Sequence, residues 1–237
     1  MIDKKLLFSG ALDCGVELDE EALERFDTYA SELVRWNTFM NLTAIKEPEE
    51  IVKKHFIDSL SLLSAVEIPQ EASLIDVGTG AGFPGIPLLI ARNDLKVTLL
   101  DSTNKRLEFI REVLSKTGLS AEVVHARAED SGRDEKYREK YDFATARAVS
   151  NLRDLCEYCL PFVKKGGYFV PMKSAKTEEE IALAEKAIKV LGGKTERVAS
   201  FNLDGAGART VLLIRKISQT PPTYPRASAK MAKFPIE

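Results

Sequence analysis

The sequence is poor in cysteine and histidine, and this scarcity argues against several kinds of site. Three cysteines, of which only Cys156 and Cys159 lie close together, give no disulfide framework and no second pair of metal ligands. Because this C-x-x-C falls in an apolar helical pattern, we interpret both thiols as core residues, with a zinc or redox pair as the less favoured alternative. The two histidines, His55 and His125, are too few for a typical histidine metal site. We expect no metal ion.

Long apolar runs and a surplus of positive charge are missing too. No run approaches the length of a membrane span, and Ser9, Gly10 and Asp13 interrupt the apolar residues near the N-terminus before they form a signal sequence. With 44% hydrophobic and 30% charged residues, the 237-residue chain is typical of a soluble, cytoplasmic protein with one substantial core. Since the net charge is −2, a nucleic acid would have to bind a local basic patch.

What the sequence does have is a glycine-rich stretch behind a short apolar segment. Residues 74–87 read LIDVGTGAGFPGIP, which predicts a buried strand, a tight turn and the start of a helix. Glycine suits such a turn because it adopts backbone angles that other residues resist and lets a ligand approach the main chain. The stretch predicts a binding site for a nucleotide-like group, and a turn that merely connects strand to helix is the alternative.

Two prolines in this stretch indicate whether the bound group carries a phosphate. Gly80, Gly82 and Gly85 also match the dinucleotide pattern G-x-G-x-x-G, which is weak evidence when taken alone. A pyrophosphate at a helix N-terminus binds the free N–H groups of the first turn, and Pro84 and Pro87 each remove one. S-adenosylmethionine carries adenine, ribose, an amino acid and a sulfonium but no phosphate, so this loop suits that cofactor better.

Around this stretch, short apolar strands alternate with helical patterns, which predicts a mostly parallel, doubly wound α/β sheet. The expected strands cover residues 74–77, 97–100, 121–125, 142–147, 167–172, 197–203 and 209–217. Helices are expected near 84–92, 104–116, 151–162 and 178–191. The short link 204–208 predicts that the last strand is antiparallel to its neighbour. Seven strands with the last one reversed form the sheet of Rossmann-like class I methyltransferases.

The two ends of the chain differ from this pattern. The N-terminal part predicts helices alone, a longer one capped by Asp19 and another that begins at Pro48. Four prolines in the tail predict that it has no regular structure. We therefore divide the chain into an N-terminal helical cap (1–70), a methyltransferase domain (71–217) and an irregular basic tail (218–237).

The carboxyl ends of the strands are where an open parallel sheet binds its ligand. Asp101 ends the second strand, where a carboxylate can accept both hydrogen bonds of a ribose diol; an N-cap for the next helix is the alternative. Residues 126–130 follow the third strand, where a carboxylate and backbone groups can recognise the adenine edge. The fourth strand ends in residues 145–149.

Four cations lie at or just past these strand ends, namely Arg106, Arg127, Arg147 and Lys173. In a chain that is slightly acidic overall, this placement predicts an anionic substrate beside the cofactor. Separate solvated loop charges are the alternative. Other basic residues that can widen the surface are Lys53, Lys54, Lys164, Lys165, Arg226, Lys230 and Lys233.

Two motifs of other methyltransferases are absent. No N/D-P-P-Y sequence follows the fourth strand, which argues against amino-group methylation of the DNA type, and no Pro-Cys nucleophile is found there. A ring nitrogen such as guanine N7 already offers a lone pair to the sulfonium methyl group and needs no general base. Catalysis would then come from positioning the reactants and desolvating the cleft, so we predict no catalytic base.

Several motifs together resemble one family, the bacterial 16S ribosomal RNA guanine-N7 methyltransferases, also called glucose-inhibited division protein B. The resemblance runs nearly end to end. The motifs that carry it are Trp36-Asn37, Asn41-Leu42-Thr43-Ala44-Ile45, His55 with Asp58-Ser59-Leu60, the loop from Asp76 to Pro87, Asp101-Ser102, Lys105-Arg106, Arg127-Ala128-Glu129, Thr145-Ala146-Arg147-Ala148-Val149 and Tyr224-Pro225-Arg226. The tail departs from the family at Ala229 and Met231, so the family's turn is not carried over there.

The resemblance implies S-adenosylmethionine as cofactor and methyl transfer to N7 of a guanine, position 527, in 16S ribosomal RNA, either naked or in a small-subunit particle. The implied cofactor contacts, with Gly80 of the same loop added, are Gly78, Gly80, Phe83, Asp101, Ser102, Thr103, Ala128, Glu129 and Arg147. RNA contacts are expected from Lys105, Arg106, Arg127, Lys173 and Arg226. Arg147 is also a candidate for positioning substrate or cofactor.

Three further expectations complete this interpretation. Asn41 and His55 are taken as satisfied polar residues where the cap meets the sheet, in preference to substrate contacts. The chain is expected to act as a monomer. Two other functions stay open on the residues alone: an NAD-dependent oxidoreductase that uses the overlapping glycine pattern, and a non-catalytic RNA-binding protein on the same fold.

Overall fold

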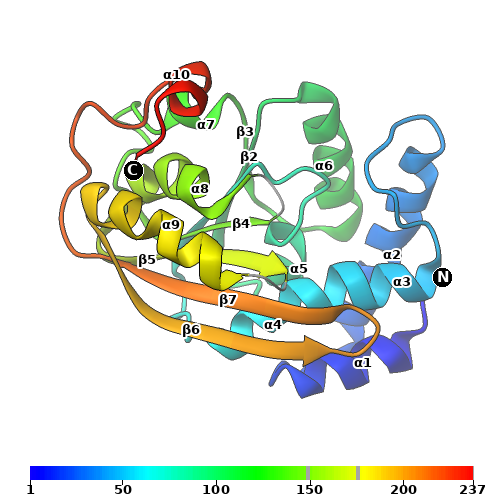
Figure 1. The fold of residues 1–237 in the computed structure, drawn as a ribbon. Coiled ribbons are helices and arrows are strands. Elements are labelled where there is room, and N and C mark those ends of the chain that lie inside the picture. The colour runs from blue at the N-terminus through cyan, green and yellow to red at the C-terminus, as the bar shows by residue number, and fades with distance from the viewer. Residues whose placement is uncertain (148–149, 175–176, 237) are drawn as a thin grey trace.

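The computed structural model describes residues 1–147, 150–174 and 177–236, which form one sheet between layers of helices (Figure 1). The strands are β1 (Ser73–Val77), β2 (Lys96–Asp101), β3 (Glu122–His125), β4 (Tyr141–Arg147), β5 (Val163–Ser174), β6 (Gly193–Leu203) and β7 (Gly207–Lys216). The helices are α1 (Lys4–Asp13), α2 (Glu20–Asn37), α3 (Pro48–Ile51), η1 (Val52–Ile57), α4 (Asp58–Ala65), α5 (Gly85–Ala91), α6 (Asn104–Thr117), α7 (Ala128–Ser131), α8 (Leu152–Cys159), η2 (Leu160–Phe162), α9 (Thr177–Val190) and α10 (Ser228–Lys233). Ala148 and Val149 of the fourth strand's motif lie outside the described residues.

The sheet has the predicted class I methyltransferase topology. Its seven strands follow the order β3-β2-β1-β4-β5-β7-β6, and β7 is antiparallel to both of its neighbours. The chain moves outward through β2 and β3 on one side of β1 and continues with β4 on the other. This reversal between β1 and β4 is the point at which an open α/β sheet binds its ligand, at the carboxyl ends of the strands.

Alternate residues of the central strands face two separate hydrophobic clusters. Leu74 belongs to a cluster with α1, α2, η1, α4, α5 and α6, whereas Ile75 and Val77 belong to one with α8 and α9. Figure 1 shows α8 and α9 over one face of the sheet. The N-terminal helices therefore share a hydrophobic cluster with the sheet, which fixes the cap residues beside the strand ends.

Two local signals placed helix starts correctly. Asp19 caps α2 by accepting a hydrogen bond from the N–H of Ala22, and Pro48 occupies the first position of α3. Gly118, with φ +66°, ends α6 in the left-handed conformation. Cys156 and Cys159 are fully buried in α8, which confirms their interpretation as core residues.

Three elements differ from the prediction. The short helix α7 follows β3 where no helix was predicted, and α8 ends earlier because Pro161 belongs to the separate 3₁₀ turn η2. The prediction that the tail has no regular structure was wrong for Ser228–Lys233, which form α10. Proline restricts its own position and the residue before it, and the prolines at 225 and 235 leave this segment free to form a helix.

Among the described residues, no helix is long and apolar enough to cross a membrane. Within the same ranges, no group of three or more histidine, cysteine, aspartate or glutamate side chains is arranged to hold a metal ion.

Candidate functional site

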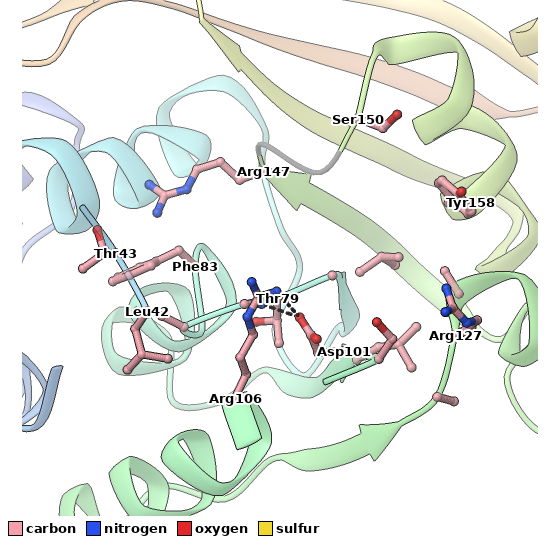
Figure 2. A pocket seen from close by; sticks show the side chains of 18 of the residues that line it. Leu42, Thr43, Thr79, Phe83, Asp101, Arg106, Arg127, Arg147, Ser150 and Tyr158 are labelled. Carbon is pink, nitrogen blue, oxygen red and sulfur yellow. Dashed lines mark hydrogen bonds and ion pairs between the residues drawn. The ribbon is translucent and has the colours of Figure 1, made fainter. Parts of the chain in front are cut away.

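A cavity of about 600 Å³ opens at the carboxyl ends of the central strands, where the strand order reverses (Figure 2). Its size is within the range of small-molecule sites in proteins. The expected cofactor residues that line it are Gly78, Gly80, Phe83, Asp101, Ser102, Ala128, Glu129 and Arg147. The remaining one, Thr103, does not line the cavity, but its N–H donates a 2.8 Å hydrogen bond to Asp101 Oδ1.

Most N–H groups of the glycine loop are already bonded within the protein. Those that donate to protein oxygens belong to Gly78, Thr79, Gly80, Gly82, Phe83, Gly85 and Ile86. The first turn of α5 therefore offers no donor for a phosphate, because Gly85 and Ile86 are occupied and Pro87 has no N–H. The loop matches a nucleoside without phosphate and does not match a dinucleotide.

Two glycines of the loop are required for different reasons. Gly80 has φ +61° and lines the cavity. A Cβ there would meet nothing closer than a backbone oxygen at 3.9 Å, so the space beside this residue is open. At Gly82, with φ +96°, a Cβ would come within 2.5 Å of the Ile86 side chain and 2.9 Å of the Tyr29 hydroxyl. The first glycine leaves backbone exposed to a ligand, and the second permits tight packing behind the loop.

Asp76, a buried residue of β1, stabilises the glycine loop through hydrogen bonds. Its Oδ2 accepts hydrogen bonds from the Thr79 hydroxyl at 2.6 Å and from the Gly85 N–H at 2.9 Å. The side chain is fully buried, and burial raises the pKa of this carboxyl to about 6. Asp76 thus fixes the turn and does not line the cavity itself.

Asp101 presents a carboxylate to the cavity while being anchored by the backbone. Oδ2 accepts from the N–H of Gly80 at 2.9 Å, Oδ1 accepts from Thr103, and Arg106 Nη1 lies 3.6 Å from Oδ2. A carboxylate can accept about four hydrogen bonds, so two positions are left for a ligand diol. The alternative role as helix cap was wrong, since Thr103 is the N-cap of α6.

The helical cap forms the opposite wall around Phe83, which Figure 2 shows beside Thr43 and Arg147. The His55 ring stacks on Phe83 with centroids 4.4 Å apart, and the Arg147 guanidinium lies 4.7 Å from the Phe83 centroid. His55 also bonds the Thr43 hydroxyl through Nε2 at 2.8 Å and Arg147 Nη2 through Nδ1 at 3.2 Å. Burial and the Arg147 charge lower the pKa of His55 to about 3, so the ring is neutral at physiological pH.

The interpretation of His55 as a satisfied polar residue is therefore confirmed, but it also lines the cavity. Asn41 is exposed, and its neighbours Leu42 and Thr43 line the cavity instead. Neither Leu42 nor Thr43 was predicted to be a contact. No local pattern identifies them, because only the packing of the cap against the sheet brings them to the strand ends.

The expected RNA-binding cations divide into three groups. Arg106 and Arg127 line the cavity, as Figure 2 shows, and Lys105 is exposed on α6 nearby. Lys173 lies at a neighbouring cavity described below. Arg226 is held elsewhere, in a bidentate pair with Glu157 on α8.

The neighbouring cavity, of about 280 Å³, shares His55 and Arg147 with the first. Asp58 lies in its wall and is nearly buried, with 6% of its side chain exposed. Its Oδ2 accepts from Arg147 Nη1 at 2.8 Å, and its Oδ1 accepts from Arg209 Nε at 2.6 Å. Arg209 was not selected from the sequence, since it lies in the last strand, far along the chain from the other site residues.

Comparisons with known proteins agree with this geometry. A family model described as rRNA small subunit methyltransferase G matches residues 22–210. Proteins named ribosomal RNA small subunit methyltransferase G from Lachnoclostridium phytofermentans and Acetivibrio thermocellus are 48% and 51% identical; the alignments cover 100% and 98% of this chain and 98% and 96% of those proteins. A solved SAM-dependent methyltransferase from Aquifex aeolicus shares the fold at 20% identity and a TM-score of 0.53, covering 70% of this chain and 92% of its own. This chain belongs to the rRNA small subunit methyltransferase G family.

Proposed function

We propose that this chain is an S-adenosylmethionine-dependent methyltransferase of 16S ribosomal RNA and that its acceptor is N7 of the guanine at position 527. Membership in the family supports the reaction and the class of substrate. The observation that carries the cofactor assignment is the glycine loop, whose first helical turn has no free N–H for a phosphate. The acceptor atom and its position come from the resemblance of the sequence motifs.

Different residues of the cavity would bind different parts of the cofactor. Asp101 would accept hydrogen bonds from the ribose hydroxyls, and the open backbone at Gly80 would lie against the amino acid portion. Ala128 and Glu129, at the start of α7, would contact the adenine edge. The bound cofactor supplies a methyl group activated by the sulfonium.

The chain's contribution to the chemical step would be positioning. N7 of guanine carries its lone pair in the ring plane and loses no proton when it is methylated, so the site needs no base. In agreement with this, His55 is held neutral between Thr43 and Arg147 and has no free nitrogen to accept a proton. Arg147, fixed over Phe83, would orient the RNA beside the methyl group.

Neither alternative function gains support from the site. An NAD-dependent oxidoreductase needs donors for a pyrophosphate at the helix N-terminus, and the first turn of α5 has none free. A non-catalytic RNA-binding protein would have no use for a carboxylate anchored to the glycine loop at the edge of a 600 Å³ cavity.

The direct test is transfer of tritium from labelled S-adenosylmethionine to unmodified small-subunit RNA, tried both as naked RNA and as the small-subunit particle. The proposal predicts label in one guanine, at position 527, with N7 methylation confirmed by strand cleavage at that base. An Arg147→Ala variant should transfer little label, whereas Arg215→Gln, on the far part of β7, should match the wild type. Label in another base, in protein or in nothing would refute the proposal.

A further inference from the structure

We infer that the second cavity, bounded by Asp58, Arg147 and Arg209, binds a backbone phosphate of the RNA substrate next to the nucleotide that is methylated. This inference rests on the proposed function, because it takes RNA as the substrate. It adds a separate subsite and assigns to it Arg209, which the cofactor cavity does not include.

The charge of the subsite is unbalanced in favour of an anion. One carboxylate, Asp58, is shared between two guanidinium groups, those of Arg147 and Arg209. All three side chains are largely buried, with 6%, 13% and 19% exposed. A surplus of one positive charge in a poorly solvated cavity matches the single negative charge of a phosphodiester.

Two lysines from other elements also contribute positive charge to the wall of the second cavity. Lys54 of η1 and Lys173 of β5 both line the cavity. Each is paired with a glutamate outside the lining, Lys54 with Glu50 and Lys173 with Glu180. The cavity wall therefore carries four cations and one carboxylate, while the glutamates orient the lysines from behind.

The position of the cavity explains why its phosphate would belong to the target nucleotide or its neighbour. Arg147 and His55 form part of the wall of both cavities, so the subsite begins where the cofactor cavity ends. A phosphate held there places the attached nucleoside beside the cofactor cavity. Guanidinium groups are well suited to this task because their planar donors match phosphate oxygens.

Asp58 would act in this subsite as a positioning residue. It reaches across from the helical cap to β4 and β7 and fixes both guanidinium groups before RNA arrives. Preorganisation of this kind reduces the cost of ordering long side chains when the substrate binds. The cap would therefore contribute to RNA recognition through a residue that does not itself bind the phosphate.

The test compares Arg209→Gln with Arg209→Lys and with a matched control, Arg215→Gln. Arg215 lies on the same strand as Arg209 and pairs with Glu196, and it lines neither cavity. At saturating S-adenosylmethionine, Arg209→Gln should raise the KM for small-subunit RNA about tenfold with little change in kcat. Arg209→Lys should lie between Arg209→Gln and the wild type, and Arg215→Gln should behave as the wild type.

A binding measurement separates this inference from the proposed function. Filter binding of the same RNA, with S-adenosylhomocysteine present, should give a salt dependence whose slope falls by about 0.7 for Arg209→Gln, the value for one phosphate contact on a single strand. The affinity for S-adenosylhomocysteine alone should stay unchanged. If the wild type bound RNA but transferred no methyl group, the proposed function would fail while the slopes still tested the subsite.

The subsite would be overturned if Arg209→Gln and Arg215→Gln gave the same KM and the same salt slope, or if the wild type bound no RNA. Thermal melting of each variant establishes that it is folded. Should Arg209→Gln not fold, Lys54→Gln replaces it, since Lys54 is more exposed and its partner Glu50 is exposed as well. That variant should also lower the salt slope, and an unchanged slope would count against the subsite in the same way.

Discussion

Two buried groups pair arginine with a carboxylate, one at the helical cap and one at the tail, and they differ in their balance of charge. On the cap side, Asp58 is shared by Arg147 and Arg209. On the tail side, Glu157 accepts three hydrogen bonds from Arg226 alone, from the backbone N–H at 2.7 Å, from Nε at 2.8 Å and from Nη2 at 2.7 Å.

The tail pair is neutral, with one carboxylate for one guanidinium. It fixes the tail to α8, the helix that carries Tyr158 of the cavity wall. Arg133 strengthens this attachment by donating to the carbonyls of Pro225 and Thr223 at 2.7 and 2.9 Å. The cap pair keeps a positive charge, and its Arg147 lines two cavities. Both groups are buried to a similar degree, so the number of carboxylates per guanidinium is the difference on which we propose a substrate-binding role for Arg147 and a structural role for Arg226.

The largest effect should come from breaking the tail pair. Arg226→Ala leaves Glu157, with 2% of its side chain exposed, as an unpaired buried charge. We expect the free energy of unfolding in urea to fall by about 3–5 kcal/mol. At a temperature where the variant is folded, its KM for RNA should equal that of the wild type. A weaker affinity for RNA at unchanged stability would instead support the RNA contact expected from the sequence.

The second-largest effect should come from removing Arg147 of the cap pair, and it should lower the rate of methyl transfer. Arg147→Ala should slow methyl transfer about 100-fold, because the residue that orients the RNA is lost. Stability should fall less than in Arg226→Ala, since Arg209 still neutralises Asp58. Single-turnover methyl transfer and urea unfolding measure the two quantities. The proposed difference between the two pairs would be refuted if Arg147→Ala were less stable than Arg226→Ala and kept its activity.

A smaller effect is expected at the cap side, where His55 should make the free energy of unfolding depend on pH. The pKa of His55 is lowered to about 3 in the folded protein, against about 6.5 when unfolded. Between these values the unfolded chain binds a proton that the native chain does not, so His55 lowers stability as pH falls, by up to about 1.4 kcal/mol per pH unit.

His55→Gln should remove this contribution, and the comparison with the wild type isolates it. Asp76 acts in the opposite direction between about pH 4 and 6, because burial raises its pKa to about 6. Urea unfolding of both proteins between pH 4.5 and 7, at roughly half-unit steps, therefore measures the difference between the two curves. Parallel curves would show that His55 is not buried in its neutral form.

These two pairs also show what sequence alone could and could not predict. The glycine loop, Asp101 and the order of strands and helices follow from local patterns, and each was placed correctly. Arg147 and Arg226 were both predicted to be functional cations, and both stay predictions; the sequence shows the charge of an arginine but not its carboxylate partner.

The partner of a charge depends on contacts between distant segments. Asp58 and Arg209 are 151 residues apart, and Glu157 and Arg226 are 69 residues apart. The helix in the tail was missed for a related reason: Met231 is buried against the rest of the molecule, and no local periodicity within six residues reveals this.

The central claim is that the glycine loop and Asp101 bind a nucleoside without phosphate, and calorimetric titration of the purified chain tests it most directly. S-adenosylhomocysteine should bind with a stoichiometry of about one, Asp101→Ala should weaken that binding at least about tenfold, and NAD should give no heat of binding. Saturable binding of NAD, or no binding of S-adenosylhomocysteine to the wild type, would contradict the account.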